Sequence, residues 1–148
     1  MPGPVFDRVL IGGEWVRAAH GTYPIVDPAT EEPAGHAPAC SVDQVRAAAC
    51  AARDAFERGP WPRLDGAERG QLLADVAARF EREAPGLVDL TIAETGAVRR
   101  VAQSQQVGAV PVRLRRWAEL AATPAEQPLG GHGVVRREPI GVVACITP

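Results

Sequence analysis

The last twelve residues decide the fold class of this chain: Arg137-Glu138-Pro139-Ile140-Gly141-Val142-Val143-Ala144-Cys145-Ile146-Thr147-Pro148. A turn signal at Glu138-Pro139 and Gly141 leads into the apolar run 142–146, which Thr147-Pro148 closes. A short run rich in β-branched residues between turn signals is typical of a strand buried on both faces. Such strands belong to parallel sheets covered by helices, and ligands bind just beyond their carboxyl ends. The sequence therefore predicts an α/β fold in which residues 142–146 lead to a binding site.

Short antiparallel strands are predicted at the other end of the chain. Two apolar stretches surround Gly12-Gly13, which is a hairpin signal over Val9 to Val16. Tyr23 to Val26 and Gly35 to Cys40 can pair in the same way across the turn-forming residues 27–32. A unit of this kind is marginal alone, so we expect residues 1–40 to pack on another surface.

Several amphipathic helices are predicted between these ends. Ser41 and Asp65 each begin a capping box, and Gly59-Pro60 ends the first helix. Pro85 is expected to open a separate helix that ends at Thr95-Gly96. A long helix follows from about Val98 to Leu120, and Pro111 either kinks it or marks its true beginning.

The helices outnumber the strands that they would have to cover. Residues 124–133 form a loop by composition, and residues 134–137 form a short strand. A strand of the 142–146 type needs neighbours on both sides, and no other parallel strand is in the sequence. We therefore expect a fold that is incomplete alone.

Composition and charge exclude several function classes. Sixteen basic and eighteen acidic residues give a net charge of −2, which disfavours nucleic-acid binding. No apolar run reaches the roughly 18–20 residues that span a bilayer, and the first residues do not form a secretory signal. Three widely spaced cysteines without metal-ligand spacing favour a reducing, cytoplasmic compartment.

No catalytic constellation can be identified from the residues themselves. His20, His36 and His132 stand alone in turns or loops. Cys145 is a conceivable nucleophile, but a cysteine in a doubly covered strand behaves as a small inert hydrophobe. We therefore expect Cys145 to lie in the core and assign no catalytic residue.

The order of several short strings resembles the N-terminal part of the NAD(P)-dependent aldehyde dehydrogenase superfamily. Each string is weak alone, but together they cover residues 9–148. They are Ile11-Gly12-Gly13-Glu14-Trp15-Val16, Val26-Asp27-Pro28-Ala29-Thr30, Ala55-Phe56 with Trp61, Arg69 and Leu72-Leu73, Ala93-Glu94-Thr95-Gly96, Trp117-Ala118, residues 137–143, and Ile146-Thr147-Pro148.

The resemblance implies three parts of a Rossmann-like cofactor domain. Residues 1–133 would form its hairpin and helical layer, residues 134–141 the start of a β arm used in subunit association, and residues 142–148 the first strand of its sheet. In the family the Ile-Thr-Pro string continues into Trp-Asn-(Phe or Tyr)-Pro. The sequence therefore resembles a family member truncated before that motif.

The resemblance also implies an activity whose catalytic groups are absent here. Family members oxidise small aldehydes to carboxylic acids with NAD or NADP through a cysteine thiohemiacetal, and they act as homo-oligomers. Only Ile146, Thr147 and Pro148 carry over, as residues close to the cofactor. We expect the chain alone to be inactive and to need neither nucleic acid nor membrane.

The resemblance also implies a candidate cation site, and the residues leave an alternative function open. Some family members bind a structural monovalent cation at positions that match Ile25, Val26 and Glu94. One departure is Gly96-Ala97-Val98, where the family often has Gly-Lys-Pro. The alternative is a non-catalytic split or degenerate module that associates with a partner chain.

Overall fold

The N-terminal unit consists of two antiparallel hairpins. The computed structural model describes residues 4–146. Strand β1 (Arg8–Ile11) pairs with β2 (Glu14–Arg17), and β3 (Thr22–Val26) pairs with β4 (Pro33–Pro38). Gly12 and Gly13 have φ values of 61° and 90°, the positive angles that a two-residue hairpin turn of this hand requires. Both predicted hairpins are confirmed.

Helix α1 (Val42–Arg58) begins at the capping box predicted at Ser41. Gln44, the reciprocal member of that box, also holds the hairpin unit in place. Its side-chain amide donates to the carbonyl of Arg17 at 2.8 Å, and its Oε1 accepts from the backbone N–H of Ala19 at 2.9 Å. One side chain thus caps α1 and attaches it to the end of β2.

Helix α2 (Gly66–Thr95) runs without interruption through Pro85, so the prediction of a separate helix beginning there is wrong. Proline leaves the carbonyl four residues earlier without its helical donor. The helix continues because it is packed on both sides of this position, with Ala77 and Val88 buried. Val88 joins a core cluster with Ala102 and Val107. Gly96, with φ of 67°, ends the helix where expected.

The predicted long helix after Gly96 is divided into three pieces. A single turn, α3 (Arg99–Val101), leads into a π-helical segment (Ala102–Val107), and α4 (Ala109–Ala121) follows. The Gly108 N–H donates to the carbonyl of Gln103 at 2.9 Å, which closes a wider, five-residue turn. Pro111 lies in the first turn of α4, so it marks the beginning of a helix, as one of the two alternatives predicted.

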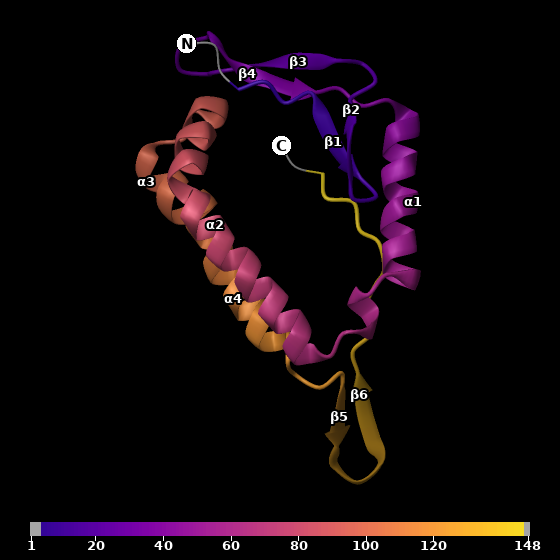
Figure 1. Cartoon of the computed structure of the whole chain (residues 1–148). Coiled ribbons are helices and arrows are strands. Elements are labelled where there is room, and N and C mark those ends of the chain that lie inside the picture. The colour runs from indigo at the N-terminus through magenta and orange to yellow at the C-terminus, as the bar shows by residue number, and fades with distance from the viewer. Residues whose placement is uncertain (1–3, 147–148) are drawn as a thin grey trace.

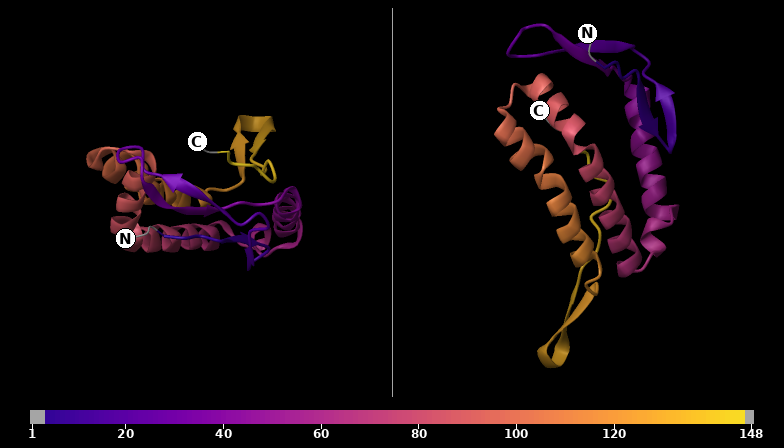
Figure 2. Two further views of the ribbon diagram at one scale, coloured as in Figure 1. Left: turned by 90° about the horizontal axis from the view of Figure 1, so that it is seen from above. Right: turned by 60° about the vertical axis from the view of Figure 1, so that its left-hand side comes forward.

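Helices α2 and α4 lie side by side in every view (Figures 1 and 2). Glycines on α2 permit the contact. A methyl group on Gly70 would lie 2.7 Å from the carbonyl oxygen of Ala118, and one on Gly66 would meet the carbonyl of Ala121. The backbone of α4 therefore lies directly against these two glycines.

A third hairpin follows α4 and projects from the rest of the chain (Figure 1). Strand β5 (Glu126–Leu129) pairs with β6 (Gly133–Arg136), although residues 124–133 were expected to be a loop. The sequence does not predict β5, because Glu-Gln-Pro-Leu shows no alternation of apolar and polar residues. Its proline is also tolerated only on edge strands. The strand predicted at 134–137 is confirmed at 133–136.

Residues 142–146 do not form the predicted strand. A strand is defined by its ladder to a neighbour, and no neighbour for this segment exists within residues 4–146. For the same reason Cys145 is exposed, and the expectation that it lies in a core is wrong for this chain.

The chain exposes far more surface than a compact protein of its mass. Its accessible surface is 11256 Å², whereas a folded monomer of this size exposes about 7,200 Å². The buried hydrophobic residues within 4–146 are all alanine or valine, whereas Ile140 and Ile146 are 96% and 95% exposed. This open arrangement agrees with the predicted α/β fold that is incomplete alone.

Two glycines of α2 provide a matched test of the close helix contact. Gly70→Ala should lower the free energy of unfolding by about 1–3 kcal/mol, because the new methyl overpacks the α4 backbone. Gly86→Ala, where nothing lies within 4 Å of the added atom, should raise it by about 0.5–1 kcal/mol through helix propensity. Urea denaturation followed by circular dichroism measures both. Equal effects of the two substitutions would contradict the contact.

An ion pair between α2 and α4 predicts a pH dependence. Hydrogen bonds from Arg115 lower the pKa of the Glu81 carboxyl, and the same bonds raise the pKa of the Arg115 guanidinium. A lowered carboxyl pKa adds stability above the ordinary value of 4.5, and that stability is lost as the pH falls through the folded pKa. Below about pH 5 the melting temperature should therefore fall more steeply in the unsubstituted chain than in Glu81→Gln. Glu83→Gln, which removes a pair within α2 alone, should keep the steep dependence.

Candidate functional site

The C-terminal segment that sequence analysis assigned to the cofactor leaves β6 beside α1. The backbone N–H of Arg137 donates to the carbonyl of Ala125 at 2.8 Å, which fixes the start of the segment. Pro139 and Gly141 share a cavity with Phe56 of α1. Gly141 has a φ of 113°, which only glycine adopts readily, so the chain turns sharply there. Residues 142–146 then extend past the helices without a sheet partner.

The three residues predicted to lie near a cofactor have different outcomes. Ile146 is exposed at the end of the segment, where an incoming group could contact it. Thr147 and Pro148 lie outside the described residues. The assignment of all three to a cofactor therefore stays a prediction.

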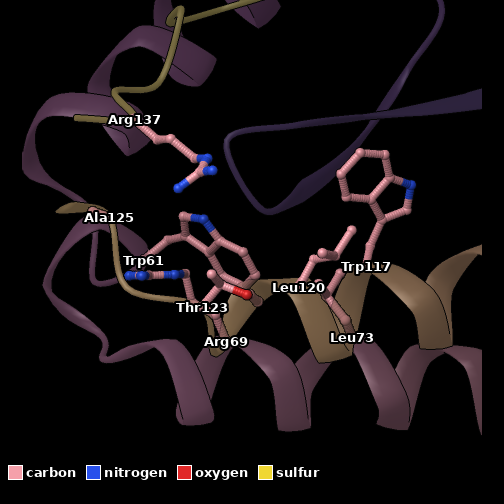
Figure 3. Close-up of a pocket in the computed structure, with 9 residues that line it drawn as sticks. Trp61, Arg69, Leu73, Trp117, Leu120, Thr123, Ala125 and Arg137 are labelled. Atoms are coloured by element: carbon pink, nitrogen blue, oxygen red, sulfur yellow. The ribbon is translucent and has the colours of Figure 1, made fainter. Parts of the chain in front are cut away.

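A pocket of 510 Å³ lies where the C-terminal segment, the turn before α2 and the end of α4 meet (Figure 3). No motif in the sequence predicts this pocket. Nine residues line it: Trp61, Arg69, Leu73, Trp117, Leu120, Ala121, Thr123, Ala125 and Arg137. Leu73 and Leu120 form an apolar floor, and Arg137 extends toward Trp61 (Figure 3).

The lining residues come from parts of the chain that are distant in sequence. Trp61 belongs to a 3-10 turn (Trp61–Arg63). Trp117 lies on α4 and Arg137 follows β6. Both tryptophans line the pocket but do not touch in Figure 3, and their shared position depends on the packing of α4 against α2.

The cation site predicted at Ile25, Val26 and Glu94 is only partly brought together. Gly96, just after α2, lies against the ring of Pro28 in the turn after β3. This contact carries Glu94, exposed in the last turn of α2, to the side of the molecule on which β3 ends. Ile25 is half-buried and Val26 is exposed. Binding of a cation by these residues stays a prediction.

The described residues contain no cluster of metal-ligating side chains and no membrane-spanning helix. Within residues 4–146 no three His, Cys, Asp or Glu side chains gather where they could hold a metal ion. No helix in the same range is long and apolar enough to cross a bilayer. Cys40, Cys50 and Cys145 are exposed and unpaired by disulfides.

Known proteins resemble this chain over nearly its whole length. The profile of the aldehyde dehydrogenase family matches residues 15–148. Aldehyde dehydrogenase 1 of Tanacetum cinerariifolium is 32% identical over 97% of the chain, and geranial dehydrogenase of Castellaniella defragrans is 33% identical over 95%. The chain spans only 30% and 31% of these two relatives.

Solved structures of the same kind share the fold. The crystal structure of Mycobacterium tuberculosis aldehyde dehydrogenase complexed with NAD+ matches 89% of this chain with a TM-score of 0.79 and 26% identity. The match covers 28% of that protein. The hairpins and helices described above are therefore those of a larger Rossmann-like α/β protein. Together with the profile match, this places the chain in the aldehyde dehydrogenase family, of which it represents an N-terminal portion.

Proposed function

We propose that this chain forms part of an NAD(P)-dependent aldehyde dehydrogenase, which oxidises small aldehydes to carboxylic acids. The family match through residue 148 is the observation that carries the proposal. Two further findings support it. The similar M. tuberculosis protein was solved with NAD+, and the related C. defragrans protein is a geranial dehydrogenase.

We assign the parts of the chain to roles in that enzyme. Residues 1–133 supply the outer hairpin and helical layer of the cofactor-binding domain, and residues 142–148 supply the first strand of its sheet. Residues 134–141 begin the β arm through which subunits associate into a homo-oligomer. The exposed edges of the β5–β6 hairpin support this last role, because unpaired strand edges readily accept another strand.

The contribution of this chain to the chemistry is positional. A bound nicotinamide cofactor would supply the hydride acceptor for aldehyde oxidation. Ile146, 95% exposed at the end of an uncharged segment, is suited to an apolar contact with such a group. Arg137 and Gly141 aim the segment, through the hydrogen bond to Ala125 and the sharp turn. Thr147 and Pro148 would complete the approach, and a monovalent cation at Ile25, Val26 and Glu94 would be structural.

Cys145 is not the nucleophile in this proposal. A catalytic cysteine needs a base or another group that favours its thiolate. The Cys145 side chain is exposed, and within residues 4–146 it belongs to no group of three or more His, Cys, Asp or Glu side chains. The thiohemiacetal would form on a cysteine that this chain does not supply. The exposed, unpaired cysteines support a cytoplasmic location.

The alternative is a non-catalytic module that completes its sheet with a partner chain. The separate two-stranded sheets and the large exposed surface of the described residues favour this alternative equally. The coding sequence beyond Pro148 distinguishes the two. A continuation into Trp-Asn-(Phe or Tyr)-Pro favours the enzyme, and a stop codon favours the module.

The 148-residue chain should show no aldehyde-dependent formation of NADH or NADPH, because it contributes the approach to the cofactor and no reacting group. The protein from the complete reading frame should show it. Absorbance at the reduced-nicotinamide band, with small aliphatic and aromatic aldehydes, measures both. Turnover by the short chain above a blank without protein would contradict the division of roles. An inactive complete protein would contradict the proposed function.

A further inference from the structure

The pocket between Trp61 and Trp117 combines apolar surface with positive charge. The indole of Trp61 is 45% exposed and that of Trp117 is 61% exposed. The guanidinium groups of Arg69 and Arg137 are also in the lining (Figure 3). Large exposed aromatic and arginine side chains gathered around one hollow are the composition of a binding hot spot.

Neither guanidinium has a carboxylate partner within residues 4–146. Arg69 donates to the backbone carbonyl of Leu64, and Arg137 donates to the side-chain oxygen of Gln127 at 3.3 Å. The neighbouring carboxylates are engaged elsewhere. Glu126 and Glu138 both pair with Arg136, and Glu68 caps the start of α2. The pocket thus holds two positive charges that the described residues do not neutralise.

This chemistry specifies an anionic group next to an apolar one. A carboxylate suits the guanidinium fork, which binds planar anions through paired hydrogen bonds. The leucine floor and the two indoles would bury the adjoining apolar group. A neutral or basic occupant would leave both arginines without a partner.

The exposed area of the whole chain favours polypeptide as the occupant of the pocket. The accessible surface of 11256 Å² exceeds that of a compact chain of this mass by about 4,000 Å². A standard protein interface buries about 800 Å² on each side. Only a long polypeptide can cover an excess of this size, and a small carboxylate would cover a minor part of it.

We propose that this pocket binds an acidic side chain flanked by a large apolar one, on a segment of the same protein that lies beyond Pro148. The inference rests on the proposed function, in which the chain is part of a longer enzyme. The bound segment would join the turn before α2, the end of α4 and the start of the cofactor-directed segment. It would therefore help to fix the orientation of residues 142–146, which follow Arg137 in the chain.

Residue-specific oxidation of the indoles tests the proposal. Hydroxyl-radical labelling read by mass spectrometry should modify Trp61 and Trp117 in the 148-residue chain. In the protein from the complete reading frame, labelling of both indoles should be lost. Arg137→Met in the complete protein should restore labelling of Trp61, whereas Arg137→Lys should keep most of the protection.

The matched control is Arg113→Met, which removes an exposed arginine of α4 that lines no part of the pocket. It should leave both indoles protected. Equal labelling of the short and complete proteins overturns the proposal. Protection that survives Arg137→Met overturns the acidic occupant. Protection of the short chain at raised concentration indicates a second copy instead and overturns the proposal.

Aldehyde oxidation is measured on the same complete protein and separates the two proposals. Activity without indole protection contradicts the pocket assignment alone. Protection without activity contradicts the proposed function alone.

Discussion

The contact of α2 with the backbone of α4 is the constraint on which the rest of the arrangement depends. Gly66 and Gly70 lie one helical turn apart on α2, and each lies against a carbonyl of α4. Ala77, about two helical turns after Gly70 on α2, is fully buried. The close approach of the two helices sets the distance between Trp61 and Trp117, and it brings Arg115 within reach of Glu81.

The α2–α4 pair supports a frame with exposed apolar faces. The apolar side chains of the two helices differ in exposure: Leu72 and Trp117 are exposed, whereas Phe80 and Leu114 are half-buried. Large exposed apolar patches are rare on monomeric proteins, and they mark surfaces that other polypeptide covers. The family assignment supplies a physical reason, because the chain spans less than a third of its relatives.

Local signals in the sequence predicted local structure well. The boxes at Ser41 and Asp65, the Gly12-Gly13 hairpin and the helix end at Gly96 are specified by residues within a few positions of one another. The errors lie where distant contacts override such signals. Pro85 is a helix breaker by local rules, yet it remains inside α2 because packing on both sides holds the helix together. Strand β5 forms because β6 pairs with it, although its own sequence has no strand pattern.

The candidate site shows the same difference between features that neighbouring residues specify and features that distant contacts create. The segment predicted to lead to a cofactor is a run of consecutive residues, 137–148, so a sequence string alone could suggest it. The Trp61–Trp117 pocket was missed because its lining comes from three separated stretches, and no spacing in the sequence links them. The predicted strand at 142–146 shows why the distinction matters, since the apolar pattern is present but the ladder requires neighbours from elsewhere.

Residues 142–146 should become a strand only when polypeptide outside this chain supplies neighbouring strands. Amide hydrogen exchange of Val143, Ala144 and Cys145 tests it directly. These amides should exchange rapidly in the 148-residue chain, which gives them no ladder partner within the described residues, and should be strongly protected in the protein from the complete reading frame. Equal protection in the two proteins would contradict the claim.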